Sequence, residues 1–314
     1  VISLADYSKE LTAPTNAAAR ENLNGWRDFT DGKVYYFTYD CNFGGYIYPY
    51  DSFKFYTRST FKSLAENGNA YFYINAQYNQ SGVMTAWGGL KQYLEAKLLW
   101  DCNSDDKALT EKYFNAVYDA YAPEMKSLFN EMHAVADAVY RSKGIGSVKY
   151  SLGPMLYSRA YDSRYAACTD VSKVKYIKLP NGSYVNFTDD MKRLSVGTTN
   201  FSVKDLDWDY SVVSAWLGRF EAIISQMNNN SRYSVEEKAV LTQRVWTEWL
   251  TPACIILDNY DTFKARGYIS AAEYTALADK LYSVYVSTGI RKYNEALDMS
   301  DYIADIKAHS DYVG

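Results

Sequence analysis

Three strand-like runs, each followed by a helical stretch, occupy the first third of the chain and constrain its fold most strongly. The runs are VISLAD at residues 1–6, KVYYFTYD at residues 33–40 and AYFYIN at residues 70–75. Each is apolar, aromatic or β-branched on both faces, as expected of a strand buried between two layers. Successive strand–helix units of this size favour a parallel sheet with right-handed crossovers. The sequence therefore predicts an α/β unit at the start of the chain.

Patterning divides the chain into four parts. We expect a partial (β/α) barrel over residues 1–104, a helical segment packed on it over 105–143, an irregular β-rich insertion over 144–206 and a helical bundle over 207–314. Apolar residues at helical spacing identify the second and fourth parts, whereas glycine, serine and β-branched residues dominate the third. Three strands cannot close an eight-stranded barrel, so we expect a preceding segment or another chain to complete it.

Local signals mark where several helices and one turn begin. Pro123 predicts a break within the second part, and Asn181-Gly182 predicts the turn of a β-hairpin in the third. Ser234 and Ser270 each precede a glutamate by three residues, which is the spacing of a capping box at a helix start. The Thr251-Pro252 pair predicts either a new helix or a kink.

Composition argues against several classes of function. The formal net charge is −4 and no Lys/Arg block is concentrated, so we expect no nucleic-acid or anionic-membrane partner. No apolar run approaches the ~20 residues of a membrane span. The four cysteines form no CxxC pair and there are only two histidines, so we expect no metal site and no cofactor. Nucleotide-binding, zinc-protease and α/β-hydrolase motifs are absent from the sequence.

Tyrosine is unusually frequent, with 32 tyrosines beside 7 tryptophans. A tyrosine offers a flat apolar face and a hydroxyl, and sugars present both kinds of surface. Core packing can account for any single tyrosine, but the clusters VYYFTYD at residues 34–40 and YIYPYDSFKFY at residues 46–56 are denser than a core requires. These clusters favour a carbohydrate ligand near the second strand.

Carboxylates close two of the predicted strands. Asp6 ends the first strand and Asp40 the second, so in a parallel sheet both would project at the same edge. Glycoside hydrolysis usually needs two carboxylates, one to donate a proton and one to act as nucleophile or to activate water. Asp40 and Asp6 are therefore the candidate catalytic residues. The alternative is that these aspartates only open loops and cap helices.

The loops after the strands carry the candidate substrate-binding residues. Amides can donate to and accept from sugar hydroxyls, and aromatic rings can lie against sugar faces. The candidates are Tyr39, Asn42, Tyr46, Tyr48, Asn75, Gln77, Asn79 and Trp87. The alternative is a set of loops packed on their own aromatic residues.

Residues 71–101, YFYINAQYNQSGVMTAWGGLKQYLEAKLLWD, resemble the barrel end of a bacterial family, domain of unknown function 4838. AKLLWD at residues 96–101 and the pairs Asn42-Phe43 and Tyr48-Pro49 agree with its pattern. The resemblance implies the C-terminal strand–helix units of a TIM-type barrel and a glycoside-hydrolase-like activity. It also implies a secreted, periplasmic or cell-surface location, with a cytoplasmic location left open.

The chain departs from that family pattern at its third strand. The family carries a glutamate followed by a glutamine near this point, whereas this chain has Asn75, Ala76 and Gln77. An amide cannot transfer a proton as a carboxylate does. Three hypotheses follow. The protein is a glycosidase acting on bacterial or plant polysaccharide or oligosaccharide, a non-catalytic glycan-binding protein, or a helical scaffold or interaction module.

Overall fold

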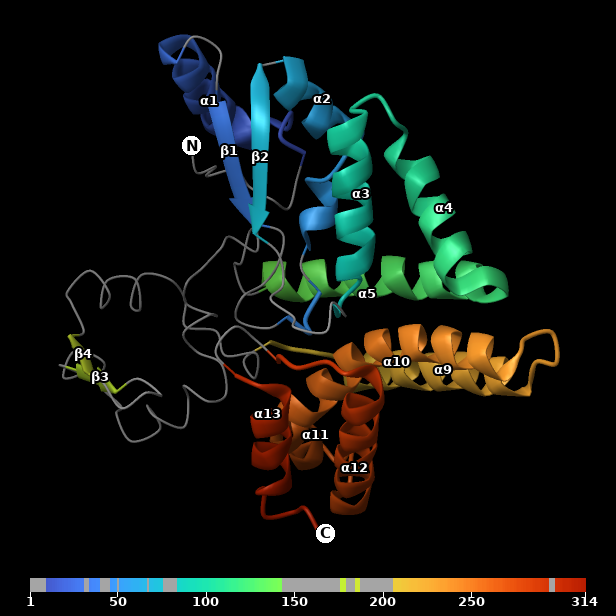
Figure 1. Ribbon diagram of the computed structural model, residues 1–314. Helices are drawn as coiled ribbons and strands as arrows, with labels where there is room; N and C mark the ends of the chain where they lie inside the picture. Colours follow the sequence, from blue (N-terminus) through green and yellow to red (C-terminus); the bar gives the residue numbers. More distant parts are fainter. Residues whose placement is uncertain are drawn as a thin grey trace.

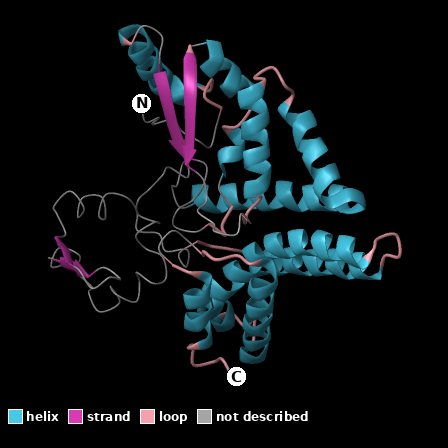
Figure 2. Cartoon of the chain, viewed as in Figure 1, coloured by secondary structure: helices cyan, strands magenta, loops and turns pink. Residues whose placement is uncertain are grey.

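A computed structural model describes residues 10–30, 34–39, 46–49, 51–66, 68–75, 84–142, 176–178, 184–186, 206–293 and 297–314. Within these residues the protein is mostly helical, with one parallel and one antiparallel two-stranded sheet. Figures 1 and 2 show an N-terminal lobe that holds the parallel sheet and a C-terminal lobe whose described part is helical. The described residues therefore have an α/β unit followed by helices.

The first described part of the N-terminal lobe holds two parallel strands that a helix connects. Its elements in order are η1 (Pro14–Asn16), α1 (Ala17–Phe29), β1 (Val34–Tyr39), η2 (Asp51–Lys54), α2 (Arg58–Glu66) and β2 (Asn69–Asn75). Strands β1 and β2 pair in parallel, with Tyr39 opposite Asn75 at their carboxyl ends. The parallel arrangement predicted for the second and third strands is confirmed. The first predicted strand, residues 1–6, lies outside the described residues.

The two faces of the β1–β2 sheet have different surroundings. On one face Tyr36 contacts Phe72 at a ring separation of 5.3 Å, and Phe72 in turn lies 6.0 Å from Phe61 of α2. The other face carries stacked aromatic pairs, Tyr35 with Tyr71 and Phe37 with Tyr73. On that face Tyr71 is 64% exposed. One face is thus covered by helices, whereas the other is an open aromatic surface.

Helices complete the N-terminal lobe after β2. They are α3 (Gly88–Trp100), α4 (Asp106–Tyr118), η3 (Asp119–Tyr121) and α5 (Ala122–Ser142). The predicted break at Pro123 is confirmed, because this proline lies in the first turn of α5, where a missing N–H costs no helical hydrogen bond. Figure 1 shows α5 lying across the lobe, below the carboxyl ends of the two strands.

The predicted β-hairpin is present in the insertion. Strands β3 (Tyr176–Lys178) and β4 (Tyr184–Asn186) pair antiparallel, with Lys178 opposite Tyr184. They flank Asn181-Gly182, as predicted. The rest of residues 143–205 lies outside the described residues.

The C-terminal lobe is formed by five helices in its described part. They are α9 (Tyr210–Asn229), α10 (Val235–Asp258), α11 (Tyr260–Ala265), α12 (Ala271–Thr288) and α13 (Met299–Lys307). Helix α10 runs through Pro252, so the alternative of a new helix at Thr251-Pro252 is wrong. Nearly every residue of α10 from Leu241 to Asp258 is buried, and this packing offsets the hydrogen bond that the proline cannot donate.

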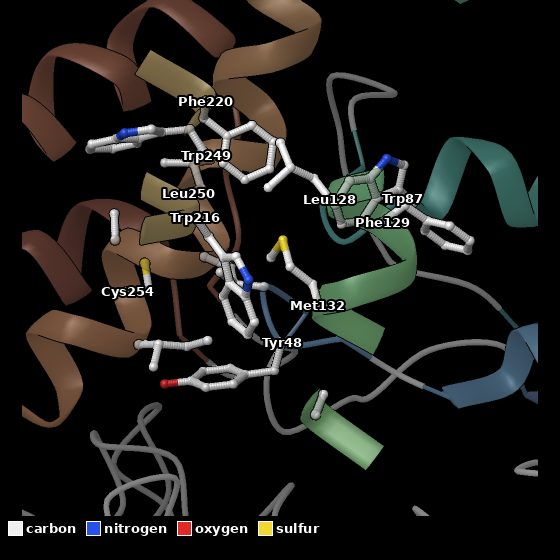
Figure 3. Close-up of a cluster of buried hydrophobic side chains, with 14 of the residues drawn as sticks. Tyr48, Trp87, Leu128, Phe129, Met132, Trp216, Phe220, Trp249, Leu250 and Cys254 are labelled. Carbon is white, nitrogen blue, oxygen red and sulfur yellow. The ribbon is translucent and has the colours of Figure 1, made fainter. Parts of the chain in front are cut away.

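One hydrophobic core spans both lobes. Figure 3 shows Leu128 and Met132 of α5 facing Trp216 and Phe220 of α9, and all four side chains are fully buried. Trp87, which precedes α3, also reaches Phe220, at a ring separation of 6.3 Å. Apolar packing therefore fixes the two lobes against each other.

Both predicted capping boxes are present, at the starts of α10 and α12. At α12 the Ser270 N–H donates to Glu273 Oε2 at 2.7 Å, and the Glu273 N–H donates to Ser270 Oγ at 3.3 Å. Since each bond satisfies a helix-end donor, Ser270→Ala should lower the free energy of unfolding by about 1 kcal/mol. Urea denaturation measures this loss. Ser283→Ala, at an exposed position within α12, is the control, and an equal loss in both variants would contradict the capping role.

Candidate functional site

A pocket of about 900 Å³ opens between α5 and the segments that follow the first two predicted strands. We call it the α5 pocket. Its lining comes from residues 10–13, from Phe53, Lys54 and Thr57, and from the face of α5 between Phe129 and Asp137. Its volume lies in the range of about 300–1,000 Å³ that is typical of small-molecule sites. The pocket is thus built from residues before η1, from η2 and the residues that follow it, and from one face of α5.

Aromatic rings form one side of the α5 pocket. Phe53 lies edge to face against Phe129 at 4.9 Å and against His133 at 5.0 Å. Phe129 and His133 themselves lie 4.4 Å apart. Trp87 supports this group from the core, 5.3 Å from the ring of Phe129. The result is a rigid apolar wall against which a ring-shaped ligand can lie.

Charged and polar side chains complete the pocket. Glu10 Oε2 accepts hydrogen bonds from Ser59 Oγ at 2.6 Å and from Thr12 Oγ1 at 3.2 Å. Lys54 Nζ and Asp137 Oδ2 form an ion pair at 3.4 Å. Hydrogen-bonding groups therefore line the same pocket as the aromatic rings, as recognition of a ligand with both apolar and polar faces requires.

His133 is a neutral imidazole in the wall of the α5 pocket. Its Nδ1 lies 2.9 Å from the carbonyl oxygen of Phe129. A carbonyl can only accept, so Nδ1 carries the proton and donates it. Nε2 is enclosed and has no hydrogen-bond partner among the described residues. The pKa of His133 is lowered to about 3, chiefly by burial and also by the nearby charges of Lys91 and Lys54, whereas the bond to Phe129 opposes the shift. The ring therefore carries no positive charge at neutral pH.

Three of the predicted substrate-binding residues lie in the core. Tyr46, Tyr48 and Trp87 are each 2% exposed or less. The Tyr48 hydroxyl donates to Asp258 Oδ2 at 2.5 Å, and the Trp87 backbone N–H donates to Glu248 Oε2 at 2.9 Å. The structure gives these three residues a packing role, since each joins the N-terminal lobe to other buried groups.

The other predicted site residues are at or beyond the strand ends. Tyr39 and Asn75 are paired in register at the carboxyl ends of β1 and β2, so the two predicted positions are neighbours, although their side chains are not described. Asp6, Asp40, Asn42, Gln77 and Asn79 lie outside the described residues. Their proposed roles remain predictions.

Sequence reasoning missed most of the α5 pocket. Phe53 and Lys54 fall inside the tyrosine-rich cluster at residues 46–56, so the region was indicated but not these residues. His133 and Asp137 belong to α5, whose periodicity indicates only a packed helix. Nothing in the spacing of those two residues indicates that α5 lies across the strand ends.

Glu248 of α10 is a buried carboxyl group beside the start of α3. It accepts the backbone N–H of Trp87, the N-cap residue of α3, where Ala86 and Trp87 both have left-handed backbone conformations with φ of 50° and 53°. Burial raises the pKa of Glu248 to about 8, although the Trp87 N–H and the Lys91 charge oppose the shift. This carboxyl group is therefore mostly protonated at pH 7.

Asp258, at the end of α10, is the acceptor for three buried tyrosines. The hydroxyls of Tyr48, Tyr293 and Tyr302 donate to its carboxylate at 2.5, 2.7 and 3.1 Å. Burial and then the Asp258 charge raise the pKa of Tyr48 and of Tyr293 well above the ordinary value. Tyr48 and Tyr293 therefore stay protonated at neutral pH and donate their hydroxyl hydrogens to Asp258.

Residues 46–49 are also held to the C-terminal lobe through their backbone. The Tyr46 N–H donates to the Tyr293 carbonyl oxygen at 3.0 Å, and Thr251 Oγ1 donates to the Ile47 carbonyl oxygen at 2.6 Å. This segment leads directly toward η2, which supplies Phe53 and Lys54 to the α5 pocket. The C-terminal lobe thus holds the backbone of residues 46 and 47, a few positions before the pocket-lining residues Phe53 and Lys54.

Residues 1–130 match the family model described as domain of unknown function (DUF4838). The resemblance to DUF4838 is confirmed. The DUF4838 match includes the strand–helix units, the loops that line the α5 pocket and Phe129, whereas His133 and Asp137 fall beyond it. The description of DUF4838 assigns no activity. No curated protein matches the chain, and no solved structure matches it.

No helix among the described residues is both long enough and apolar enough to cross a membrane. They also hold no group of three or more His, Cys, Asp or Glu side chains placed to bind a metal ion.

Proposed function

We propose that this protein binds and cleaves a carbohydrate, as a glycosidase of bacterial or plant polysaccharide or oligosaccharide. The α5 pocket is the observation that carries the proposal, because it combines an aromatic wall with a polar rim beside loops that follow strands. A sugar ring has apolar C–H faces and hydroxyl edges, so it requires both kinds of surface. A secreted, periplasmic or cell-surface location suits an enzyme that acts on such polymers.

Asp40 and Asp6 are the catalytic pair in this proposal. One carboxylic acid donates its proton to the glycosidic oxygen as the bond to the anomeric carbon breaks, and the other carboxylate attacks that carbon or activates a water molecule. Asn75 and Gln77 hydrogen-bond to sugar hydroxyls. The α5 pocket holds a sugar ring next to the strand ends, and its aromatic wall orients that ring.

Residues 1–104 form the C-terminal strand–helix units of a TIM-type barrel in this proposal. The open aromatic face of the β1–β2 sheet supports it, with Tyr35, Tyr71 and Tyr73 exposed by 51%, 64% and 49%. In a barrel one face of each strand packs on helices, and the other packs on side chains from the remaining strands. A preceding segment or another chain that adds strands would cover these tyrosines.

A non-catalytic glycan-binding protein is the second candidate. It is favoured by Asn75, which ends β2 directly opposite Tyr39 at a place where the family carries a glutamate. The scaffold hypothesis receives less support, because Glu248 and Asp258 join the helical lobe to the N-terminal lobe through buried hydrogen bonds.

A glycan array and a chromogenic-glycoside screen test the proposal. Phe53→Ala should weaken glycan binding about tenfold, because it removes one ring of the aromatic wall. Phe29→Ala, which removes an 83% exposed ring of α1, should leave binding unchanged, and circular dichroism checks that both variants fold. Turnover that is lost in Asp40→Asn supports a glycosidase, and binding without turnover supports the second candidate. No binding to any glycan would contradict both.

A further inference from the structure

We infer that the α5 pocket selects a sugar unit with a free amino group over one with a carboxylate group, and that Glu10 determines this specificity. The inference rests on the proposed carbohydrate binding and names the class of sugar. Three features of the pocket carry it: an available carboxylate oxygen, the balance of lining charges and an uncharged histidine in an aromatic wall.

Glu10 has one carboxylate oxygen to offer a ligand. Its Oε2 accepts from Ser59 Oγ and Thr12 Oγ1, and these two bonds orient the carboxylate in the lining of the pocket. Its Oε1 accepts no hydrogen bond from the described residues. An ammonium group is the strongest partner for such an oxygen, because it has three donors and the opposite charge.

The charges that line the α5 pocket favour a cation over an anion. Two carboxylates, Glu10 and Asp137, line it together with one ammonium group, that of Lys54. Lys54 forms an ion pair with Asp137 at 3.4 Å, so its charge is largely offset and Glu10 sets the sign of the field. A sugar carboxylate would lie near Glu10 and be repelled by it.

His133 adds no positive charge to the aromatic wall, although the buried ammonium group of Lys91 lies 5.5 Å from the centre of the Phe53 ring. His133 lies against Phe53 and Phe129 as a neutral ring, with its single N–H donated to the Phe129 carbonyl oxygen. An ammonium group close to this wall therefore meets no repulsion from His133, and the ring faces that Lys91 does not cover attract cations. The wall and Glu10 thus favour the same ligand, a sugar ring with a charged amine.

Calorimetric titration with three oligosaccharides of equal length tests the inference. The probes are a glucosamine oligomer with free amines, its N-acetylated form and a galacturonic acid oligomer, all at pH 6, where the sugar amine is charged. We expect the amine form to bind about tenfold more tightly than the uronic acid form, since its hydrogen bond to Glu10 is charge-assisted. Raising the salt from about 0.05 M to about 0.5 M should reduce this preference.

Glu10→Gln separates charge recognition from the other contacts of the pocket. We expect it to weaken binding of the amine form roughly fivefold to tenfold while binding of the acetylated form changes less than about twofold. Glu21→Gln, an exposed change on α1 outside the pocket lining, is the control and should alter neither. Equal loss for both forms in Glu10→Gln, or equal binding of all three oligomers, would overturn the inference and leave carbohydrate binding standing. Absence of binding by every oligomer would overturn both.

Discussion

The Glu248→Gln variant should become more stable than the unchanged protein as the pH rises, and the difference should be largest above pH 8. Glu248 is 5% exposed, and its carboxyl group accepts the backbone N–H of Trp87 across the boundary between the lobes. Burial raises its pKa from 4.5 to about 8. A glutamine keeps a carbonyl acceptor for the Trp87 N–H and carries no charge at any pH, so it removes the cost of ionising a buried group.

The direction of this pH dependence follows from where the proton is bound. Between pH 4.5 and about 8 the folded protein keeps a proton on Glu248 that the unfolded chain has released. The stability from this group is therefore fully present below pH 4.5 and is lost as the pH rises through 8. At 1.36 kcal/mol for each pKa unit, the loss is at most about 5 kcal/mol.

His133 gives the opposite slope at acid pH. Its pKa is lowered from 6.5 to about 3, so the unfolded chain takes up a proton on this ring before the folded protein does. The stability from His133 is therefore present above pH 6.5 and is lost as the pH falls toward 3. The two groups oppose each other between pH 4.5 and 6.5, so the effect of Glu248 is clearest at alkaline pH.

Thermal unfolding at acid, neutral and alkaline pH measures the effect. Glu236→Gln is the control, because Glu236 is an exposed carboxylate in the first turn of the same helix. The control should differ from the unchanged protein by less than about 1 kcal/mol at every pH. If Glu248→Gln shifts stability by the same amount at all pH values, the Glu248 carboxyl group titrates near its ordinary pKa and this account of its environment is wrong.

Features of the fold that depend on residues only a few positions apart, such as helix caps and tight turns, could be predicted from the sequence. The capping boxes at Ser234 and Ser270 form because each serine and its glutamate are three residues apart, so their geometry depends on one helical turn. The hairpin at Asn181-Gly182 is predictable for the same reason. At Pro252 the local signal left a new helix and a continuing, kinked helix as alternatives, and burial of the C-terminal half of α10 decides for a continuing helix.

The placement of the aromatic residues depends on partners far along the chain. Tyr48 forms a hydrogen bond with Asp258, which is 210 residues further along the chain, and Trp87 forms one with Glu248, which is 161 residues further along. The sequence around an aromatic residue that follows a strand does not show whether its ring faces a ligand or the core. Only the position of the C-terminal lobe shows that the rings of Tyr48 and Trp87 are buried. Phe53, which belongs to the same tyrosine-rich cluster as Tyr48, lines the α5 pocket instead.

The described part of the helical lobe therefore contributes no residue to the lining of the α5 pocket but contacts residues that lie next to it. Helix α10 places Glu248 at the start of α3 and Asp258 against the segment that leads to η2. Both contacts are buried, and both support residues next to the α5 pocket. A change in α10 is thus expected to alter the N-terminal lobe as well as the C-terminal one.

Asp258→Ala is expected to destabilise both lobes, by about 3–5 kcal/mol. The hydroxyls of Tyr48, Tyr293 and Tyr302 all donate to this carboxylate, and all three tyrosines are 1% exposed or less. Removing the acceptor removes three buried hydrogen bonds, and the loss of a buried hydrogen bond costs about 1–3 kcal/mol. The sum is less than additive, because the cavity left by the carboxylate allows the rings to shift.

Hydrogen exchange shows whether the effect of Asp258→Ala crosses between the lobes. Because Tyr48 belongs to the segment that leads to η2, exchange should rise in peptides covering residues 46–57 as well as in the C-terminal helices. Tyr302→Phe removes only the longest of the three bonds and keeps the ring stacked on Tyr293 at 4.1 Å, so it should cost about 1 kcal/mol. Asp301→Ala, at an exposed position of α13, should have almost no effect. Faster exchange in the C-terminal helices alone would mean that Asp258 stabilises its own lobe without holding the segment that leads to the α5 pocket.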